Sequence, residues 1–199
     1  QSLTYRHACH HSTCGACGMR VNGVEKLTCI TPIHQVTRDG GTIRLEPLRN
    51  FPVISDLVVD VSSLFSRMEQ TRLSQVAPVE SACSPAELSQ PANQGEYERL
   101  IDCIECGLCV SACPSALTST GYVGPAVLSA AQLSHSIHND PDLILLVDHE
   151  DGLWRCHSAY ECSEVCPSNV DPAWRIMDMR KMLIRQKIHR IFHPTEESR

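Results

Sequence analysis

Apolar and polar residues alternate over short stretches in the first third of the chain, which is the pattern of half-buried β-strands. The alternation over residues 21–29 is interrupted at Asn22-Gly23, a pair typical of the two-residue turn of a hairpin. Residues 42–45 alternate again, and residues 57–59 form an apolar run of the length of a short buried strand. The sequence therefore predicts mainly β-structure over residues 19–61.

Helical spacing of apolar residues replaces this alternation further along the chain. A first helix is predicted after Ser62, which is of the residue type that caps helix N-termini. The same spacing predicts helices over residues 96–102, 127–137 and 173–192.

Residues 77–95 separate the two patterns and contain three prolines among Ser, Ala, Gln and Asn. This composition predicts an irregular connection, and we place a domain boundary within it. The boundary gives a mostly β domain over residues 1–80 and a mostly α domain over residues 81–199. The predicted fold class is α+β.

Charge and composition exclude several classes of protein. The 199 residues include 17 Lys and Arg against 23 Asp and Glu, a net charge of −6, which argues against a nucleic-acid-binding protein. The longest aliphatic run, residues 143–147, is far shorter than the roughly 20 apolar residues of a membrane-spanning helix. Seven of the basic residues fall within residues 175–199, where they form either a solvated helix face or a surface for anionic lipid or an acidic partner.

The chain contains 12 cysteines, and their spacing decides between disulfides and metal ligation. No stretch near Gln1 resembles a secretion signal, so an oxidising compartment has no support. Metal ligation is therefore the favoured use of the thiols.

The first cysteine group has the spacing C-x4-C-x2-C-x11-C, which is close to that of plant-type [2Fe-2S] ferredoxins. Gly15 and Gly18 suit such a loop, because small residues let backbone N–H groups approach the sulfurs. Structural zinc is an alternative for this group, and His10 and His11 leave open a Rieske-type centre. The group consists of Cys9, Cys14, Cys17 and Cys29.

The second and third groups form a pair of bacterial ferredoxin runs. The second is C-x2-C-x2-C-x3-C-P, a run in which the fourth cysteine ligates the other cluster. The third matches it, except that Ala159 occupies the position of the second cysteine. Exchanging the last cysteines assigns a [4Fe-4S] cluster to Cys103, Cys106, Cys109 and Cys166, and leaves Cys113, Cys156 and Cys162 for the other cluster.

Three thiolates hold a [3Fe-4S] cluster, because the corner that would carry a fourth iron has no ligand. Losing one thiolate also lowers the negative charge around the iron, which raises the reduction potential. Closed four-thiolate zinc sites do not fit the seven thiols of these two runs. Cys83 is left over and is predicted to be a small buried residue.

Several short sequence motifs lie around the cysteines. They are residues 2–6 (SLTYR), 14–23 (CGACGMRVNG), 46–48 (EPL), 51–60 (FPVISDLVVD), 124–126 (GPA) and 155–158 (RCHS). Together with the order of the three cluster motifs, they resemble the iron-sulfur subunit of the succinate dehydrogenase/fumarate reductase (complex II) family.

The resemblance implies a plant-ferredoxin-like β-grasp domain followed by an α-helical bacterial-type dicluster ferredoxin domain. The family carries further strands before the position of Gln1, so the β-grasp is expected to lack its first strands. Electrons would pass between FAD on a separate flavoprotein subunit, which carries the succinate/fumarate site, and a quinone at membrane anchor subunits. The chain would lie on the cytoplasmic face of a bacterial or archaeal inner membrane, or on the matrix side in mitochondria.

Pro114, Ser115 and His157 match family positions near the quinone. The tryptophan that ubiquinone-using members carry soon after the first Cys-Pro is replaced here by residues of the stretch 115–118 (SALT). This departure favours menaquinone, or another acceptor geometry, over a standard ubiquinone pocket.

Two alternatives remain at this point. The chain could belong to a soluble reductase of the thiol:fumarate or heterodisulfide type, in which a non-quinone donor replaces the membrane. From a different class, it could be a structural zinc protein that acts as an interaction scaffold.

Overall fold

The computed structural model describes residues 2–71, 103–138 and 141–192. The first range contains β1 (Gly18–Val21), β2 (Val24–Leu27), η1 (Thr28–Ile30), α1 (Ile33–Val36), β3 (Leu45–Glu46), β4 (Val53–Ser55), β5 (Val58–Val59) and α2 (Ser62–Gln70). The others contain α4 (Leu108–Ala112), α5 (Pro114–Thr118), α6 (Pro125–His138), α7 (Pro141–Val147), η3 (Leu153–Arg155), α8 (Glu161–Glu164) and α9 (Pro172–Phe192). Small sheets followed by helices confirm the α+β class.

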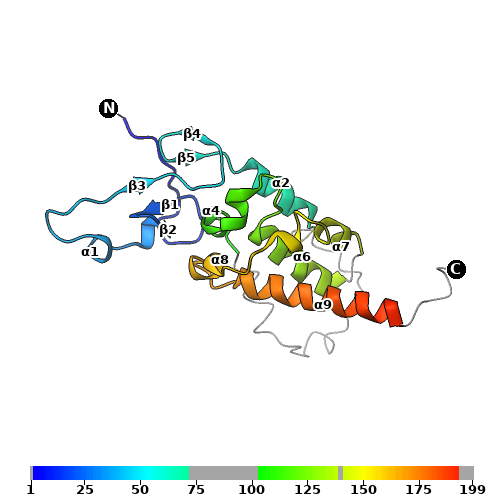
Figure 1. The fold of residues 1–199 in the computed structure, drawn as a ribbon. Helices are drawn as coiled ribbons and strands as arrows, with labels where there is room; N and C mark the ends of the chain where they lie inside the picture. The colour runs from blue at the N-terminus through cyan, green and yellow to red at the C-terminus, as the bar shows by residue number, and fades with distance from the viewer. Residues whose placement is uncertain (1, 72–102, 139–140, 193–199) are drawn as a thin grey trace, which may run out of the picture.

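The strands form two small antiparallel sheets at one end of the molecule (Figure 1). The larger has the order β2-β1-β3, and Val21 pairs with Val24 across the predicted hairpin turn. Asn22 and Gly23 have φ angles of 52° and 85°, the left-handed values that a type I′ turn requires. The strand predicted over residues 42–45 begins only at Leu45, where β3 pairs with β1.

The second sheet pairs β4 with β5, of which only β5 was predicted. The N-terminal segment runs beside this hairpin, because Leu57 N donates to Thr4 O at 3.1 Å and Thr4 N donates to Asp56 Oδ2 at 2.7 Å. Helix α2 follows as predicted, but its cap differs. Ser62 is the first helical residue and donates its backbone N–H to Asp60 Oδ1 at 2.9 Å, so Asp60 supplies the cap.

Helices α6 and α9 pack together and confirm the predicted helices over residues 127–137 and 173–192. Val127, Leu128 and Ile176 are fully buried within this core. The last turns of α9 are not buried in this core, since Ile188 and Ile191 are about half and three-quarters exposed. No helix in the described ranges is long and apolar enough to span a membrane.

Several predictions fall outside the described residues. They are the helix over residues 96–102, the connection over residues 77–95 with its domain boundary, and the environment of Cys83.

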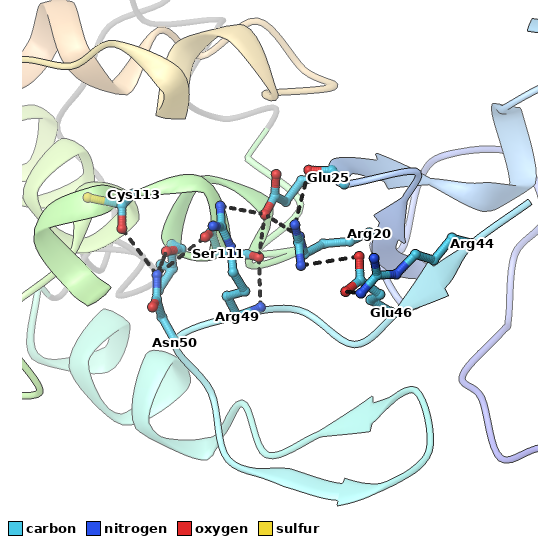
Figure 2. A network of polar contacts seen from close by, with 10 residues as sticks. Arg20, Glu25, Arg44, Glu46, Arg49, Asn50, Ser111 and Cys113 are labelled. Atoms are coloured by element: carbon cyan, nitrogen blue, oxygen red, sulfur yellow. Dashed lines mark hydrogen bonds and ion pairs between the residues drawn. The ribbon is translucent and has the colours of Figure 1, made fainter. Parts of the chain in front are cut away.

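Helix α4 lies between the sheets and the larger helices (Figure 1), and a buried polar network joins it to the strands (Figure 2). Ser111 Oγ donates to Glu25 Oε1 at 2.8 Å and accepts the backbone N–H of Arg49 at 2.9 Å. Glu25 Oε1 also lies 3.5 Å from Arg20 Nε and 3.4 Å from Arg49 Nη2. The carboxylate is only 4% exposed, so these cations compensate for its lost hydration.

Asn50 adds a second link to the same helix. Its Nδ2 donates to the carbonyl oxygens of Val110 and Cys113 at 2.8 and 3.1 Å, and Ser111 O lies 3.3 Å away. These carbonyls end α4, where the intrahelical donors run out. The strand-bearing part therefore caps the helix that carries Cys109 and ends at Cys113.

Glu25→Gln is expected to lower the free energy of unfolding by about 2 kcal/mol, because it removes the buried carboxylate that faces Arg20 Nε and Arg49 Nη2. Arg20 then keeps Glu46 Oε2, 3.4 Å from its Nη1, as its remaining counter-charge. Urea unfolding of the iron-loaded chain, followed by far-UV circular dichroism, measures this change. Arg44→Gln is the matched control. The Arg44 side chain is 75% exposed, so its ion pair with Glu46 should contribute less than about 1 kcal/mol, and equal losses from the two variants would contradict the prediction.

Candidate metal centres

The first cysteine group surrounds the loop before β1. Its members are Cys9, Cys14 and Cys17 of that loop and Cys29 of η1. Backbone N–H groups of His11 and Thr13 donate to Cys9 Sγ at 3.5 and 3.3 Å, and Cys9 N donates to Cys14 Sγ at 3.5 Å. The loop thus points its amides at sulfur, as an iron-sulfur site requires.

Left-handed backbone makes this loop possible. His10, Ser12 and Gly15 have φ angles of 62°, 60° and 69°, which turn successive N–H groups toward the thiols. The N–H of Thr28 donates to Cys17 O at 3.3 Å, which ties η1 to the loop.

The electrostatics of the loop favour a thiolate at its exposed end. The His11 N–H, with smaller contributions from Cys14 and Thr13, lowers the pKa of Cys9 to about 6. Partial burial and the nearby thiol of Cys17 raise the pKa of Cys29. Cys9 is therefore ready to ligate a metal at neutral pH, since the thiolate is the ligating form.

The second group lines a cavity of about 520 Å³, a volume that includes its open mouth. Residues from α6 and the segment after α8 complete its largely apolar wall. Burial raises the pKa of Cys106 to about 11, and burial followed by the neighbouring thiols raises that of Cys109 well above its ordinary value. The structure brings together Cys103, Cys106, Cys109 and Cys166 in this wall.

The third group lines a separate cavity of about 300 Å³ that holds Cys113, Cys156 and Cys162. Ala159 lies in the same wall. Burial, and then Cys113 and Cys156, raise the pKa of Cys162 to about 12. The Cys156 loop is fixed by Arg180, which donates through Nε to Leu153 O at 2.9 Å and through Nη2 to Cys156 O at 2.6 Å.

The three residues predicted near a quinone also lie at this third cavity. Ser115 is buried, and its Oγ accepts the backbone N–H of His157 at 3.3 Å. Pro114 and His157 are exposed, so they mark the solvent side of the site.

Tyr122 lines the third cavity too, and sequence reasoning missed it. The residue is 3% exposed. Burial, followed by the thiols of Cys156, Cys113 and Cys162, raises its pKa. Tyr122 directly precedes the motif Val-Gly-Pro-Ala, which was the available indication in the sequence. Nothing in that motif connects Tyr122 with the cysteines.

The first and second groups meet at Gly15. A Cβ on this residue would lie 2.7 Å from Cys106 Cβ and 2.9 Å from Ile104 O. Gly18 is also close, since its Cβ would lie 3.3 Å from Cys106 O. Only a loop without side chains here allows the two cysteine groups to approach so closely.

These arrangements suit clusters better than single ions. Within the described ranges, no three Cys, His, Asp or Glu side chains converge closely enough to hold one metal ion. The thiols of the second and third groups line cavities instead, whereas structural zinc needs four ligands around one point. The buried thiols require a strong local positive charge to ionise, which a bound metal centre of either kind supplies.

Comparisons with known proteins agree with this donor set. Residues 1–66 match the model of the 2Fe-2S iron-sulfur cluster binding domain, and residues 99–170 match that of the 4Fe-4S dicluster domain. The fumarate reductase iron-sulfur subunit of Escherichia coli O6:H1 is 35% identical over 174 residues, which cover 86% of this chain and 70% of that protein. The chain belongs to the family of fumarate reductase and succinate dehydrogenase iron-sulfur subunits.

Other members of the family extend the match. The 8-methylmenaquinol:fumarate reductase iron-sulfur subunit of Wolinella succinogenes is 32% identical over 197 residues, covering 94% of this chain and 61% of that protein. A chain of the Mycobacterium smegmatis Sdh1 complex superposes with a TM-score of 0.77 at 25% identity, covering 94% of this chain and 79% of its own length. The predicted electron-transfer role of an iron-sulfur subunit is confirmed, and the soluble-reductase and zinc alternatives are not favoured.

Gly15→Ala is expected to push the first cysteine loop of this iron-sulfur subunit away from Cys106, because the new methyl group would overlap it. The magnetic coupling between the reduced first and second clusters should weaken, which the EPR line broadening of the fully reduced protein measures.

Gly40→Ala is the matched control for this variant. Gly40 has a similar φ angle of 75° but nothing within 4 Å of an added Cβ. It bears only the backbone cost, roughly 1 kcal/mol. Unchanged line broadening in Gly15→Ala, or the same change in both variants, would show that the contact does not set the spacing.

Proposed function

We propose that this chain is the electron-transfer subunit of a quinone-linked fumarate reductase or succinate dehydrogenase complex. Its partners are a flavoprotein subunit, which carries FAD and the succinate/fumarate site, and one or more membrane anchor subunits. The chain itself contributes no catalytic residue. It lies peripherally on the cytoplasmic face of a bacterial or archaeal inner membrane, or on the matrix side in mitochondria.

Continuity between the three cysteine groups carries this proposal. The first group touches the second at Gly15 and Cys106. The second and third share α4, since Cys109 lies in that helix and Cys113 directly follows it. When bound, the clusters supply sites that each accept and release a single electron. The residues of this chain hold those sites in a fixed order.

The proposed ligands follow the cavities. A [2Fe-2S] cluster binds Cys9, Cys14, Cys17 and Cys29, a [4Fe-4S] cluster binds Cys103, Cys106, Cys109 and Cys166, and a [3Fe-4S] cluster binds Cys113, Cys156 and Cys162. A methyl group at Ala159, in the wall of the third cavity, supports the missing fourth ligand there. The family-model matches over residues 1–66 and 99–170 support the division into domains 1–80 and 81–199.

The quinone end of the path is the third site. Pro114 and His157 are exposed at its cavity, and Ser115 holds the His157 backbone. No tryptophan lies between residues 114 and 118, and a relative is a menaquinol:fumarate reductase subunit. Both observations support menaquinone as the membrane electron carrier.

Membranes with the assembled complex should couple menaquinol oxidation to fumarate reduction. Washing off this chain should abolish that coupling, because the flavoprotein then has no path for electrons to or from the membrane. Fumarate reduction with a soluble dye donor should persist in the released flavoprotein. Adding back the iron-loaded chain should restore the quinol-linked rate, and a rate that survives complete removal of the chain would overturn the proposal.

Low-temperature EPR tests the third site in the same complex. The air-oxidised sample should show the near-isotropic signal of a spin one-half [3Fe-4S] cluster, which disappears on reduction. Ala159→Cys should supply a fourth thiolate, permit a [4Fe-4S] cluster and remove the oxidised signal. Leu117→Cys, an exposed thiol on α5, is the control and should leave the signal intact. A silent oxidised parent, or an unchanged signal in Ala159→Cys, would contradict the assignment.

A further inference from the structure

The hydroxyl of Tyr122 is buried and makes no hydrogen bond of normal geometry among the described residues, although the Cys156 thiol lies near enough to help raise its pKa. Three buried side-chain atoms of the described residues have no hydrogen-bond partner, namely Arg20 Nε, Tyr122 Oη and Ser134 Oγ. Such an atom costs roughly 1–3 kcal/mol, so each one needs an explanation. Arg20 Nε has one, because it faces the Glu25 carboxylate at 3.5 Å. Ser134 lines neither cysteine cavity, whereas Tyr122 lines the third.

Backbone contacts on both sides hold the Tyr122 ring in place. Arg67 Nη1 donates to Tyr122 O at 2.6 Å, and the next residue, Val123, donates its N–H to Asp151 O at 2.9 Å. The ring itself belongs to the main apolar core, together with Val127 and Leu153. A ring fixed in this way cannot swing its hydroxyl out to water.

The cavity that Tyr122 lines is walled by the three thiols of the third group. Sulfur suits a buried phenol donor there, because thiolates and cluster sulfides carry negative charge. Of the other acceptors in the wall, His157 and Glu161 are exposed, and Ser115 Oγ already accepts the His157 N–H. The backbone N–H of Ser158 already donates to Cys156 Sγ at 3.4 Å, so a sulfur of this site already accepts one hydrogen bond.

We propose that the Tyr122 hydroxyl donates a hydrogen bond to a sulfur atom of the third cluster and thereby raises its reduction potential. The inference rests on the proposed function, because it takes the cluster to be bound by Cys113, Cys156 and Cys162. A donor at sulfur stabilises the reduced state more than the oxidised one, since the reduced cluster is more negative. Tyr122 therefore stabilises the reduced state of the third cluster, which is the cluster beside the quinone.

The test is an EPR redox titration of the third cluster in the full complex, comparing the parent with Tyr122→Phe. Loss of the donor should reduce the equilibrium constant for reduction by about threefold to tenfold, as expected for a hydrogen bond to a charged acceptor. For a one-electron couple this lowers the midpoint potential by about 30 to 60 mV. Pulsed electron-nuclear double resonance should also detect one exchangeable proton near the cluster of the parent that Tyr122→Phe lacks.

Tyr160→Phe is the matched control. It removes a hydroxyl from the wall of the same cavity, but the residue is 48% exposed and its hydroxyl is solvated. Its potential and proton coupling should equal those of the parent. Substituting 3,5-difluorotyrosine at position 122 keeps the ring and makes the hydroxyl a stronger donor. It should move the potential upward, opposite to Phe, which simple loss of packing cannot do.

An unchanged potential and an unchanged proton coupling in Tyr122→Phe would overturn the inference while leaving the cluster in place. A downward shift in the fluorinated variant would do the same, and it decides the matter if Tyr122→Phe loses its cluster. If the parent complex shows no [3Fe-4S] signal at all, the proposed function fails instead.

Discussion

Keeping many thiols close together in a protein interior is the constraint on which this structure depends. Burial raises the pKa of Cys106, Cys109 and Cys162, and neighbouring thiols raise those of Cys109 and Cys162 further. Ionising several of them together requires a compensating positive charge, which iron provides. The segments that carry them are short loops and helices of four or five residues, too short to be stable alone. Iron binding is therefore expected to stabilise the fold of this region.

Helix α4 is the element through which the constraint reaches the rest of the chain. It presents Cys109 to one cavity and ends at Cys113, which lines the other. The strand-bearing part secures this helix from the side through Glu25 and Ser111, and at its end through Asn50 (Figure 2). A shift of α4 would change the spacing between all three cysteine groups. The buried carboxylate of Glu25 is tolerated beside this helix because it helps to hold the helix in place.

Patterns local in sequence predicted much of the fold and most of the candidate site. The Asn22-Gly23 turn and the long helices α6 and α9 follow from short-range geometry, and cysteine spacing grouped the thiols that line each cavity. What sequence reasoning missed depends on contacts between distant segments. Strand β4 forms because it pairs with β5. Glu25 has a structural role because it accepts a hydrogen bond from Ser111, which is 86 residues away. Tyr122 likewise matters because it lies near Cys156, and no periodicity in the sequence connects the two residues.

Two features act on the third site in the same direction. In the proposed ligand assignment Ala159 stands where a fourth thiolate would lie, and the proposed Tyr122 hydrogen bond adds a donor, so each makes the site less electron-rich. The second cavity has the opposite character, with four thiols in a largely apolar wall that includes α6. An electron is therefore held more tightly beside the exposed face of Pro114 and His157 than in the middle of the chain. In the proposed complex the net direction of electron flow is then set by the electron donor and the electron acceptor at the two ends of the path.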